Sequence, residues 1–165
     1  MGLAEGRLAM IAFTVYGEAK PGGSKRAFRN PHTGKIAMVD ASGKAGKDWR
    51  RAVAEAGAEA MGNRELYREA LVVSMIFYRP RPKSHLRTNG EVRPSAPRDP
   101  ITRPDVLKLA RLCEDALTGI VYHDDSCIVS EHLYKCYGEP ARVYVSIDTA
   151  ANAKPIHSSL RAAVA

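Results

Sequence analysis

The amino-acid sequence predicts a single α+β domain in which one mixed β-sheet packs against two main helices. Three observations support this prediction. The chain has 165 residues, which suffices for one compact domain and is short for two. Short apolar runs of strand length occur at four places, and two longer segments repeat apolar residues at helical spacing. In chain order these segments give strand, helix, strand, helix, strand, strand, without an internal repeat.

A strand and a long loop begin the chain. Residues 10–16 (MIAFTVY) alternate and are rich in β-formers, so we expect a strand there. Residues 17–43 hold five glycines, two prolines and several Lys and Arg, which is typical of a long functional or mobile loop. We expect this loop to contain a short hairpin around Thr33–Gly34.

A helix and a central strand follow. Residues 42–61 are predicted to form a helix that Gly62 ends, because apolar residues recur there at helical spacing: Trp49, Val53, Ala56 and Ala60. Residues 71–78 (LVVSMIFY) are apolar enough for a strand at the centre of a sheet. Residues 79–104 hold six prolines and many arginines, which predicts an irregular excursion.

The second predicted helix covers residues 104–117. Proline suits the first turn of a helix, and Gly119 suits its end. A turn at residues 120–126 carries the sequence His-Asp-Asp.

Two strands close the predicted sheet. They cover residues 127–134 and 142–147, and the Gly-Glu-Pro turn at 138–140 predicts that they form a hairpin. We therefore place the domain at residues 1–148. The Ala- and Ser-rich tail at 149–165 is expected to be a short helix or disordered.

The net charge of +7 is unevenly distributed. Residues 20–51 hold nine Lys and Arg against two Asp, and residues 79–103 hold seven against two acidic residues. From Pro104 to the end, six basic residues meet eight acidic ones. A basic surface around an acidic pocket is what a metal-dependent nuclease needs, because basic groups bind phosphates and carboxylates hold cations. The alternative interpretation is a basic domain whose positive charge only keeps it soluble.

Cysteines and hydropathy bear on the cellular compartment. Cys113, Cys127 and Cys136 are odd in number and lack metal-type spacing, so we expect buried reduced thiols. No apolar run approaches the roughly 20 residues that span a bilayer, and residues 1–10 lack the apolar core of a signal peptide. These observations predict a cytoplasmic protein that uses neither a membrane nor a small-molecule cofactor.

The segment from Thr102 to Ser126 carries the candidate chemistry. On a helical wheel the apolar residues of the helix share one face, and the polar residues share the other: Lys108, Arg111, Glu114 and Asp115. Asp105 lies in the first turn, where the helix dipole favours a carboxylate, and simple capping is the alternative interpretation. Asp124 and Asp125 lie in the turn before the next strand, and a solvated turn is the alternative for them.

Asp105 and Asp125 are about 20 residues apart, and we expect them to meet where the helix and the strand edge converge. Two carboxylates there would hold a divalent cation such as Mg²⁺, with water and phosphate as further ligands. Such a cation polarises the scissile phosphate and lowers the pKa of a bound water. Arg111 would offset charge on the phosphoryl oxygens if its side chain extends toward the helix start.

At these residues the sequence resembles the RusA family of Holliday junction resolvases, which are largely encoded by phages and prophages. The matching residues are Arg103, Pro104, Asp105, Leu109, Arg111, Asp115-Ala116-Leu117, Gly119, Asp124-Asp125-Ser126 and Ile128-Val129. The match is strong over residues 102–129 and looser elsewhere. It implies a homodimer in a bacterial or phage-infected cell. The homodimer would bind four-way DNA junctions and resolve them with Mg²⁺ or Mn²⁺, by paired phosphodiester hydrolysis in recombination and repair.

The resemblance also implies roles for single residues. Asp105 matches the family's first catalytic aspartate, Asp125 its last, and Arg111 its catalytic lysine. Leu107 lies where the family has a second catalytic aspartate, and Lys108 lies at its usual asparagine. Because leucine cannot bind a cation, one of three expected metal ligands is absent. Arginine at position 111 keeps the charge but changes the hydrogen-bond geometry.

Several explanations for the missing ligand remain open. Three acidic side chains are candidates to replace it: Asp115, Glu114 and, as our preference because it adjoins a matched ligand, Asp124. Otherwise the two matched aspartates suffice with more water. A junction-binding protein that cuts weakly or not at all is the alternative function, and a function unrelated to DNA is a third. On the polar face, Leu107 is expected to meet a partner chain or to pack against a loop.

Two basic segments are candidates for DNA contact. Glycines in the first segment allow close backbone approach to phosphates, and its basic side chains supply charge: Lys20, Lys25, Arg26 and Arg29, joined by Lys108 on the helix. Phe28 either wedges at an unstacked base or holds the loop in place. The second segment either lines a DNA groove or is a solvated loop: Arg79, Arg81, Lys83, Arg87 and Arg93. His123 is either a proton-transfer group or a surface histidine.

Overall fold

A computed structural model describes residues 9–23, 25–40 and 43–153. Within the first hairpin the side chains of residues 25, 26, 28 and 37–40 are not described. Most of the predicted tail, residues 154–165, also lies outside the described part.

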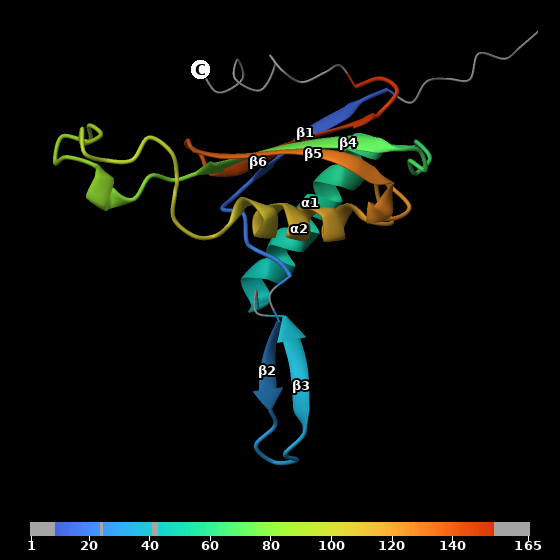
Figure 1. The fold of residues 1–165 in the computed structure, drawn as a ribbon, viewed down its shortest axis with the longest axis horizontal. Helices are drawn as coiled ribbons and strands as arrows, with labels where there is room; N and C mark the ends of the chain where they lie inside the picture. The colour runs from blue at the N-terminus through green and yellow to red at the C-terminus, as the bar shows by residue number, and fades with distance from the viewer. Residues whose placement is uncertain (1–8, 24, 41–42, 154–165) are drawn as a thin grey trace, which may run out of the picture.

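A four-stranded sheet forms the body of the molecule, in the order β1-β6-β4-β5 (Figure 1). Its strands are β1 (Ile11–Tyr16), β4 (Leu71–Arg79), β5 (Ile128–Tyr137) and β6 (Arg142–Thr149). Strand β4 pairs parallel with β5 and antiparallel with β6, which itself pairs antiparallel with β1. The predicted mixed sheet and the central place of β4 are therefore confirmed.

The predicted hairpin of the last two strands is wrong, because β4 lies between β5 and β6. The connection at residues 138–141 instead crosses the end of β4. There the Gly138 N–H donates to the Arg79 carbonyl at 3.0 Å. A Cβ at Gly138 would lie 2.7 Å from the Tyr78 ring, so glycine permits this close crossing.

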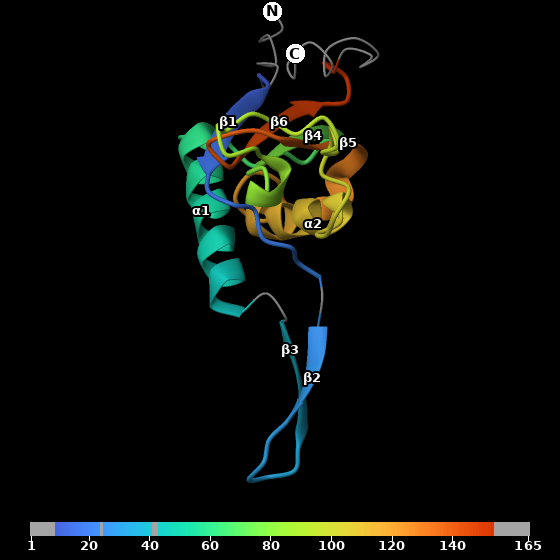
Figure 2. The same cartoon turned by 90° about the vertical axis from the view of Figure 1, so that its left-hand side faces the viewer.

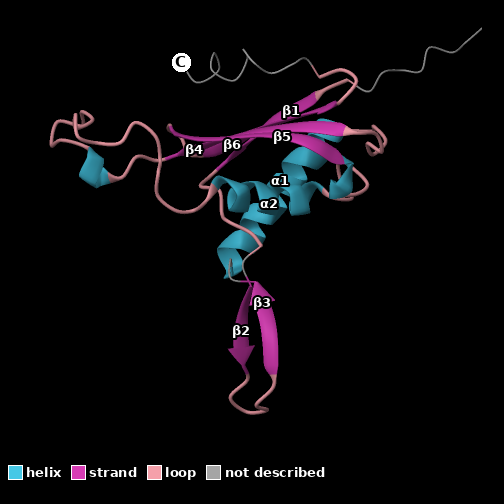
Figure 3. Ribbon diagram, in the orientation of Figure 1, coloured by secondary structure: helices cyan, strands magenta, loops and turns pink. Residues whose placement is uncertain are grey.

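Two helices, α1 (Gly43–Met61) and α2 (Val106–Leu117), cover one face of the sheet (Figure 3). Both were predicted and are confirmed, although Asp105 is the N-cap of α2 and Pro104 precedes the helix instead of lying in its first turn. Helix α2 buries the face that the wheel identifies as apolar, which includes Leu109, Leu112 and Leu117. These side chains join Trp49 and Val53 of α1 and the inner residues of the sheet in one core.

Two segments stand apart from this body. Strands β2 (Lys25–Arg29) and β3 (Ile36–Asp40) form a separate two-stranded sheet that projects from the body (Figure 2). This confirms the predicted hairpin, and Gly34 takes a positive φ of 68° in its turn. The predicted irregular excursion between β4 and α2 is also confirmed, and its regular structure is the short 3₁₀ helix η1 (Lys83–His85).

The three cysteines are free: Cys113 and Cys136 are buried and Cys127 is half-buried. Burial raises the pKa of the Cys113 thiol to about 12, so the group stays protonated and unreactive. Among the described residues, no helix combines the length and hydrophobicity needed to cross a membrane.

Candidate functional site

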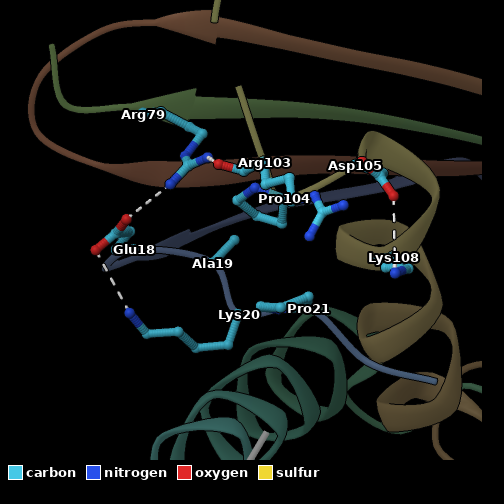
Figure 4. Close-up of a pocket in the computed structure, with 9 residues that line it drawn as sticks. All are labelled: Glu18, Ala19, Lys20, Pro21, Arg79, Arg103, Pro104, Asp105 and Lys108. Atoms are coloured by element: carbon cyan, nitrogen blue, oxygen red, sulfur yellow. Dashed lines mark hydrogen bonds and ion pairs between the residues drawn. The ribbon is translucent and has the colours of Figure 1, made fainter. Parts of the chain in front are cut away.

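A basic hollow lies where α2 begins, and we call it the α2-start hollow (Figure 4). Its volume is about 400 Å³. Three segments that are distant in sequence meet there: the loop after β1, the end of β4 and the approach to α2. Its lining residues are Glu18, Ala19, Lys20, Pro21, Arg79, Arg103, Pro104, Asp105 and Lys108. Four cationic and two anionic side chains in this lining favour an anionic ligand.

Arg79 is fixed within the α2-start hollow. Its guanidinium donates to Glu18 Oε1 at 3.0 Å and to the Arg103 carbonyl at 3.0 Å. Only 17% of its side chain is exposed. The hydrogen bond from Arg79, assisted by Lys20 at 3.4 Å, lowers the pKa of Glu18. Glu18 therefore stays ionised and holds one arginine and one lysine in place beside the start of α2.

Asp105 presents its carboxylate to the same hollow. It is the N-cap residue of α2, but its side chain accepts no hydrogen bond from the helix N–H groups. The side chain is 60% exposed and has an ion pair with Lys108 at 3.8 Å. From β5, Lys135 donates to the Thr102 and Pro104 carbonyls at 2.8 and 3.0 Å, which fixes the segment leading into Asp105. The backbone that leads into Asp105 is therefore fixed, while its exposed carboxylate makes one ion pair, with Lys108.

The loop that carries Lys20 is held tightly against α2. The Gly22 N–H donates to the Lys108 carbonyl at 2.8 Å. A Cβ at Gly22 would lie 2.8 Å from Leu112 Cβ and 3.0 Å from its Cα, so only glycine fits this crossing. Next to it, a Cβ at Gly23 would lie 2.8 Å from Arg111 Cδ, which places the Arg111 side chain under this loop.

A second hollow of about 400 Å³ lies where β5 begins, and we call it the β5-start hollow. Its lining residues are Glu114, Asp125, Ile128, Val129, Ser130 and Glu131. Burial and a hydrogen bond shared with Glu131 raise the pKa of Glu114 to about 8. Glu114 is therefore largely protonated near neutral pH, in the hollow that Glu131 and Asp125 also line.

Asp124 has a structural role instead of facing this hollow. Its carboxylate accepts from the Ser126 N–H at 2.9 Å and caps the 3₁₀ helix η2 (Asp125–Cys127). The hydrogen bonds from Ser126 lower its pKa. Our preferred third metal ligand is thus used as a cap, whereas Glu114, a weaker candidate, lies beside Asp125.

The structure does not bring Asp105 and Asp125 together within one chain. Strand β5 runs back along α2: Lys135 reaches Pro104 at the helix start, while Glu131 meets Glu114 near the helix end. Asp105 and Glu114 are nine residues apart, which is about 14 Å along a helix axis. The described residues hold no group of three His, Cys, Asp or Glu that could ligate a metal ion. The expected meeting of the two aspartates is therefore not realised in one chain, because a rigid helix separates them.

The predicted DNA-binding residues divide into three groups. Lys20 and Lys108 line the α2-start hollow, as a phosphate-binding role requires. Arg29 lies exposed on β2, while the side chains of Lys25 and Arg26 are outside the described residues. The side chain of Phe28 is also outside the described residues. His123, predicted to be either a proton-transfer group or a surface histidine, is exposed.

Within the second basic segment, Arg79 alone lines the α2-start hollow. Arg81 instead stacks over Tyr137 at 4.1 Å and donates to the Pro97 carbonyl, and Arg93 donates to the Leu86 carbonyl. These two arginines stabilise the excursion itself. Sequence reasoning missed Arg103 as a lining cation, and its place directly before the Pro-Asp motif was the available signal.

Gly22→Ala should destabilise the fold and displace Lys20. The new methyl group meets the backbone of α2 at Leu112, and overpacking of this kind costs about 1–3 kcal/mol. We expect a lower urea midpoint and weaker DNA binding in the same variant. An unchanged midpoint would show that the loop is not held against α2.

Glu114→Gln should make stability less dependent on pH. Because the folded-state pKa of Glu114 is raised, its contribution to stability is present below its usual pKa of 4.5 and is lost as the pH rises toward about 8. Relative to the parent, the free energy of unfolding of the variant should rise by about 1–2 kcal/mol between about pH 5 and about pH 9, after discounting for partial exposure. Urea unfolding in EDTA measures this change, with Glu59→Gln on the exposed side of α1 as control. Parallel pH profiles for parent and variant would contradict the assignment.

Comparisons with known proteins identify the family to which the chain belongs. Residues 18–148 match the family described as Endodeoxyribonuclease RusA. The chain is also similar to the Uncharacterized protein YqaN of Bacillus subtilis (strain 168), at 33% identity over 140 residues, which cover 83% of this chain and 94% of that protein. The family match begins at Glu18 in the α2-start hollow and extends past the β5-start hollow. The resemblance found in the sequence is confirmed, and the chain belongs to the RusA family of endodeoxyribonucleases.

Proposed function

We propose that this protein is a divalent-metal-dependent endonuclease that resolves four-way DNA junctions by paired phosphodiester hydrolysis in recombination and repair. The observation that carries the proposal is the carboxylate of Asp105, which makes no hydrogen bond to the helix terminus and lines a basic hollow. A structural aspartate would be expected to hydrogen-bond to the helix terminus. An aspartate that makes no such hydrogen bond and instead faces cations is suited to act at a bound phosphate.

The α2-start hollow would bind the DNA backbone next to Asp105. Lys20, Arg103 and Lys108 supply charge, and Arg79 is already oriented by Glu18 and the Arg103 carbonyl. Oriented cations of this kind stabilise negative charge on phosphoryl oxygens without reorganising during the reaction. Arg111, which lies under the loop at Gly23, is proposed to act on the same charge.

We propose that the metal site forms between two copies of the chain. A twofold axis across α2 would set the Asp105 end of one protomer against the Asp125 end of its partner, and twofold pairs are the commonest oligomers. Leu107 near one carboxylate and Val129 near the other are 67% and 63% exposed, and both suit an interface. Carboxylate oxygens are the ligands that Mg²⁺ and Mn²⁺ prefer, and a cation held there would activate water and neutralise phosphate charge.

Asp105→Asn and Asp125→Asn should each abolish cutting while junction binding persists. Each change keeps the shape of the side chain and removes the charge, and we expect the nicking rate to fall by at least about 100-fold. Labelled four-way junctions with Mg²⁺ or Mn²⁺ measure nicking, and gel shifts in EDTA measure binding. Asp124→Asn is the matched control and should keep most activity because that carboxylate is a cap. Failure of the parent to nick with either metal, from protein that binds the junction, would overturn the enzymatic proposal.

Mixing the two inactive variants tests the shared site. If each site takes Asp105 from one protomer and Asp125 from its partner, a mixed dimer has one intact site and one doubly altered site. Refolding Asp105→Asn together with Asp125→Asn should then restore nicking of one strand. A site contained within one chain would give no restoration.

Leu107→Asp should increase cutting. It returns a carboxylate to the exposed face of α2, two residues from Asp105, where the family has its second aspartate. We expect a nicking rate about 10-fold higher, equivalent to roughly 1.4 kcal/mol of transition-state stabilisation. Leu107→Asn, which has the same size and no charge, serves as control. Equal rates for both variants would show that position 107 lies outside the metal site.

A second candidate function is junction binding with little or no cutting. Leu107 favours it, because the leucine removes a ligand that the family supplies. Junction binding by the parent without nicking in either metal would establish this function instead.

A further inference from the structure

The projecting hairpin, residues 25–40, is not used by the site described above, and we call it the β2–β3 arm. Its two strands pair with each other in a separate sheet and extend away from the body (Figures 1 and 2). An isolated two-stranded hairpin is only marginally stable in water. Ile36 is also 70% exposed on it. A partner that covers the arm would therefore stabilise it.

The tip of the arm is well ordered by its own hydrogen bonds. Asn30 Oδ1 accepts from the backbone N–H groups of His32 and Thr33 at 2.8 and 3.2 Å. The backbone carbonyl of Asn30 accepts from the Gly34 N–H at 2.8 Å. The backbone N–H of Asn30 donates to the Lys35 carbonyl at 2.9 Å. These bonds fix the backbone geometry at the far end of the arm, where a partner would meet it.

The chemistry of the arm indicates which partner it fits. Residues 25–40 contain four Lys and Arg and one acidic residue, Asp40, which lies at the base of the arm opposite Lys25. Arg29 and Lys35, at the tip end of the two strands, are both exposed, as is His32 between them. A polyanion complements the arm in charge.

We propose that the β2–β3 arm enters the major groove of one duplex arm of the bound DNA. The major groove admits a two-stranded β-ribbon, and exposed Arg and Lys on such a ribbon reach the phosphates at the groove edges. Arg29 and Lys35 make these phosphate contacts. The arm thereby holds a duplex at a distance from the α2-start hollow, so that one protomer grips DNA at two places. This inference rests on the proposed function.

Paired charge variants test the contacts. Arg29→Gln with Lys35→Gln removes two positive charges from the arm, and Arg64→Gln with Arg68→Gln removes two from exposed positions on the body. For the arm variant, the plot of log affinity against log salt should lose about 2 units of slope, because each phosphate contact contributes about 0.9. Affinity for a four-way junction should fall at least about 10-fold in the same variant. Equal losses in the arm and body variants would overturn the proposal.

Protection of the DNA from chemical methylation tests whether the arm lies in the major groove. Dimethyl sulfate methylates guanine N7, which faces the major groove. The full chain should protect guanines in a duplex arm of the junction. Protection should vanish in a variant whose residues 27–38 are replaced by Asn-Gly, while its body keeps its thermal unfolding midpoint. Guanines that stay reactive under the full chain, or protection that survives the deletion, would overturn the proposal.

The oligomeric state and the DNA binding of the full chain and its arm variants distinguish failure of the arm proposal from failure of the proposed function. If the full chain is dimeric and the shortened variant is monomeric by light scattering, the arm binds a second copy and the groove proposal is wrong. If the full chain nicks junctions and the arm variants bind as tightly as the parent, the arm proposal alone fails. If the full chain fails to bind branched DNA, the proposed function fails with it.

Discussion

The parallel pairing of β4 with β5 is the constraint on which the rest of the structure depends. Parallel neighbours need a crossover connection, and here the excursion after β4 and helix α2 provide it. The helix must run opposite to both strands in order to return the chain to the start of β5. Asp105, at the start of α2, and Asp125, just before β5, consequently line two separate hollows. The division of the candidate site into two hollows is thus a result of topology.

Much of the fold could be predicted because the spacing of apolar residues along the sequence indicates which face of a helix or strand is buried. The apolar stripe of α2, from Leu109 to Leu117, and the continuous apolar run of β4 both mark surfaces that are buried in the structure. Strand pairing could not be predicted in the same way. The Gly-Glu-Pro turn after β5 is compatible with a hairpin, and only the insertion of β4 excludes one. That insertion depends on pairing between residues 57 to 78 positions apart, which local sequence patterns do not report.

Single residues of the candidate site could be predicted from the sequence, but the contacts between them could not. Sequence motifs identify Asp105, Lys20 and Lys108, which the structure gathers in one hollow. They do not identify the ion pair of Glu18 with Arg79, which joins residues 61 positions apart. Nor do they distinguish a carboxylate that caps a turn from one that faces a ligand, because Asp124 and Asp125 are neighbours with opposite roles.

Glu18 has a consequence for how long DNA stays bound. Its carboxylate already satisfies Arg79 and Lys20, so an arriving phosphate meets cations whose charge is partly neutralised. A lone phosphate or a short oligonucleotide gains little there, whereas a branched duplex adds contacts along its whole backbone. Under the proposed function, this built-in anion would weaken the binding of cleaved ends and so favour turnover. An acid of the protein's own in the hollow would thus favour large substrates over small ones and let the product leave sooner.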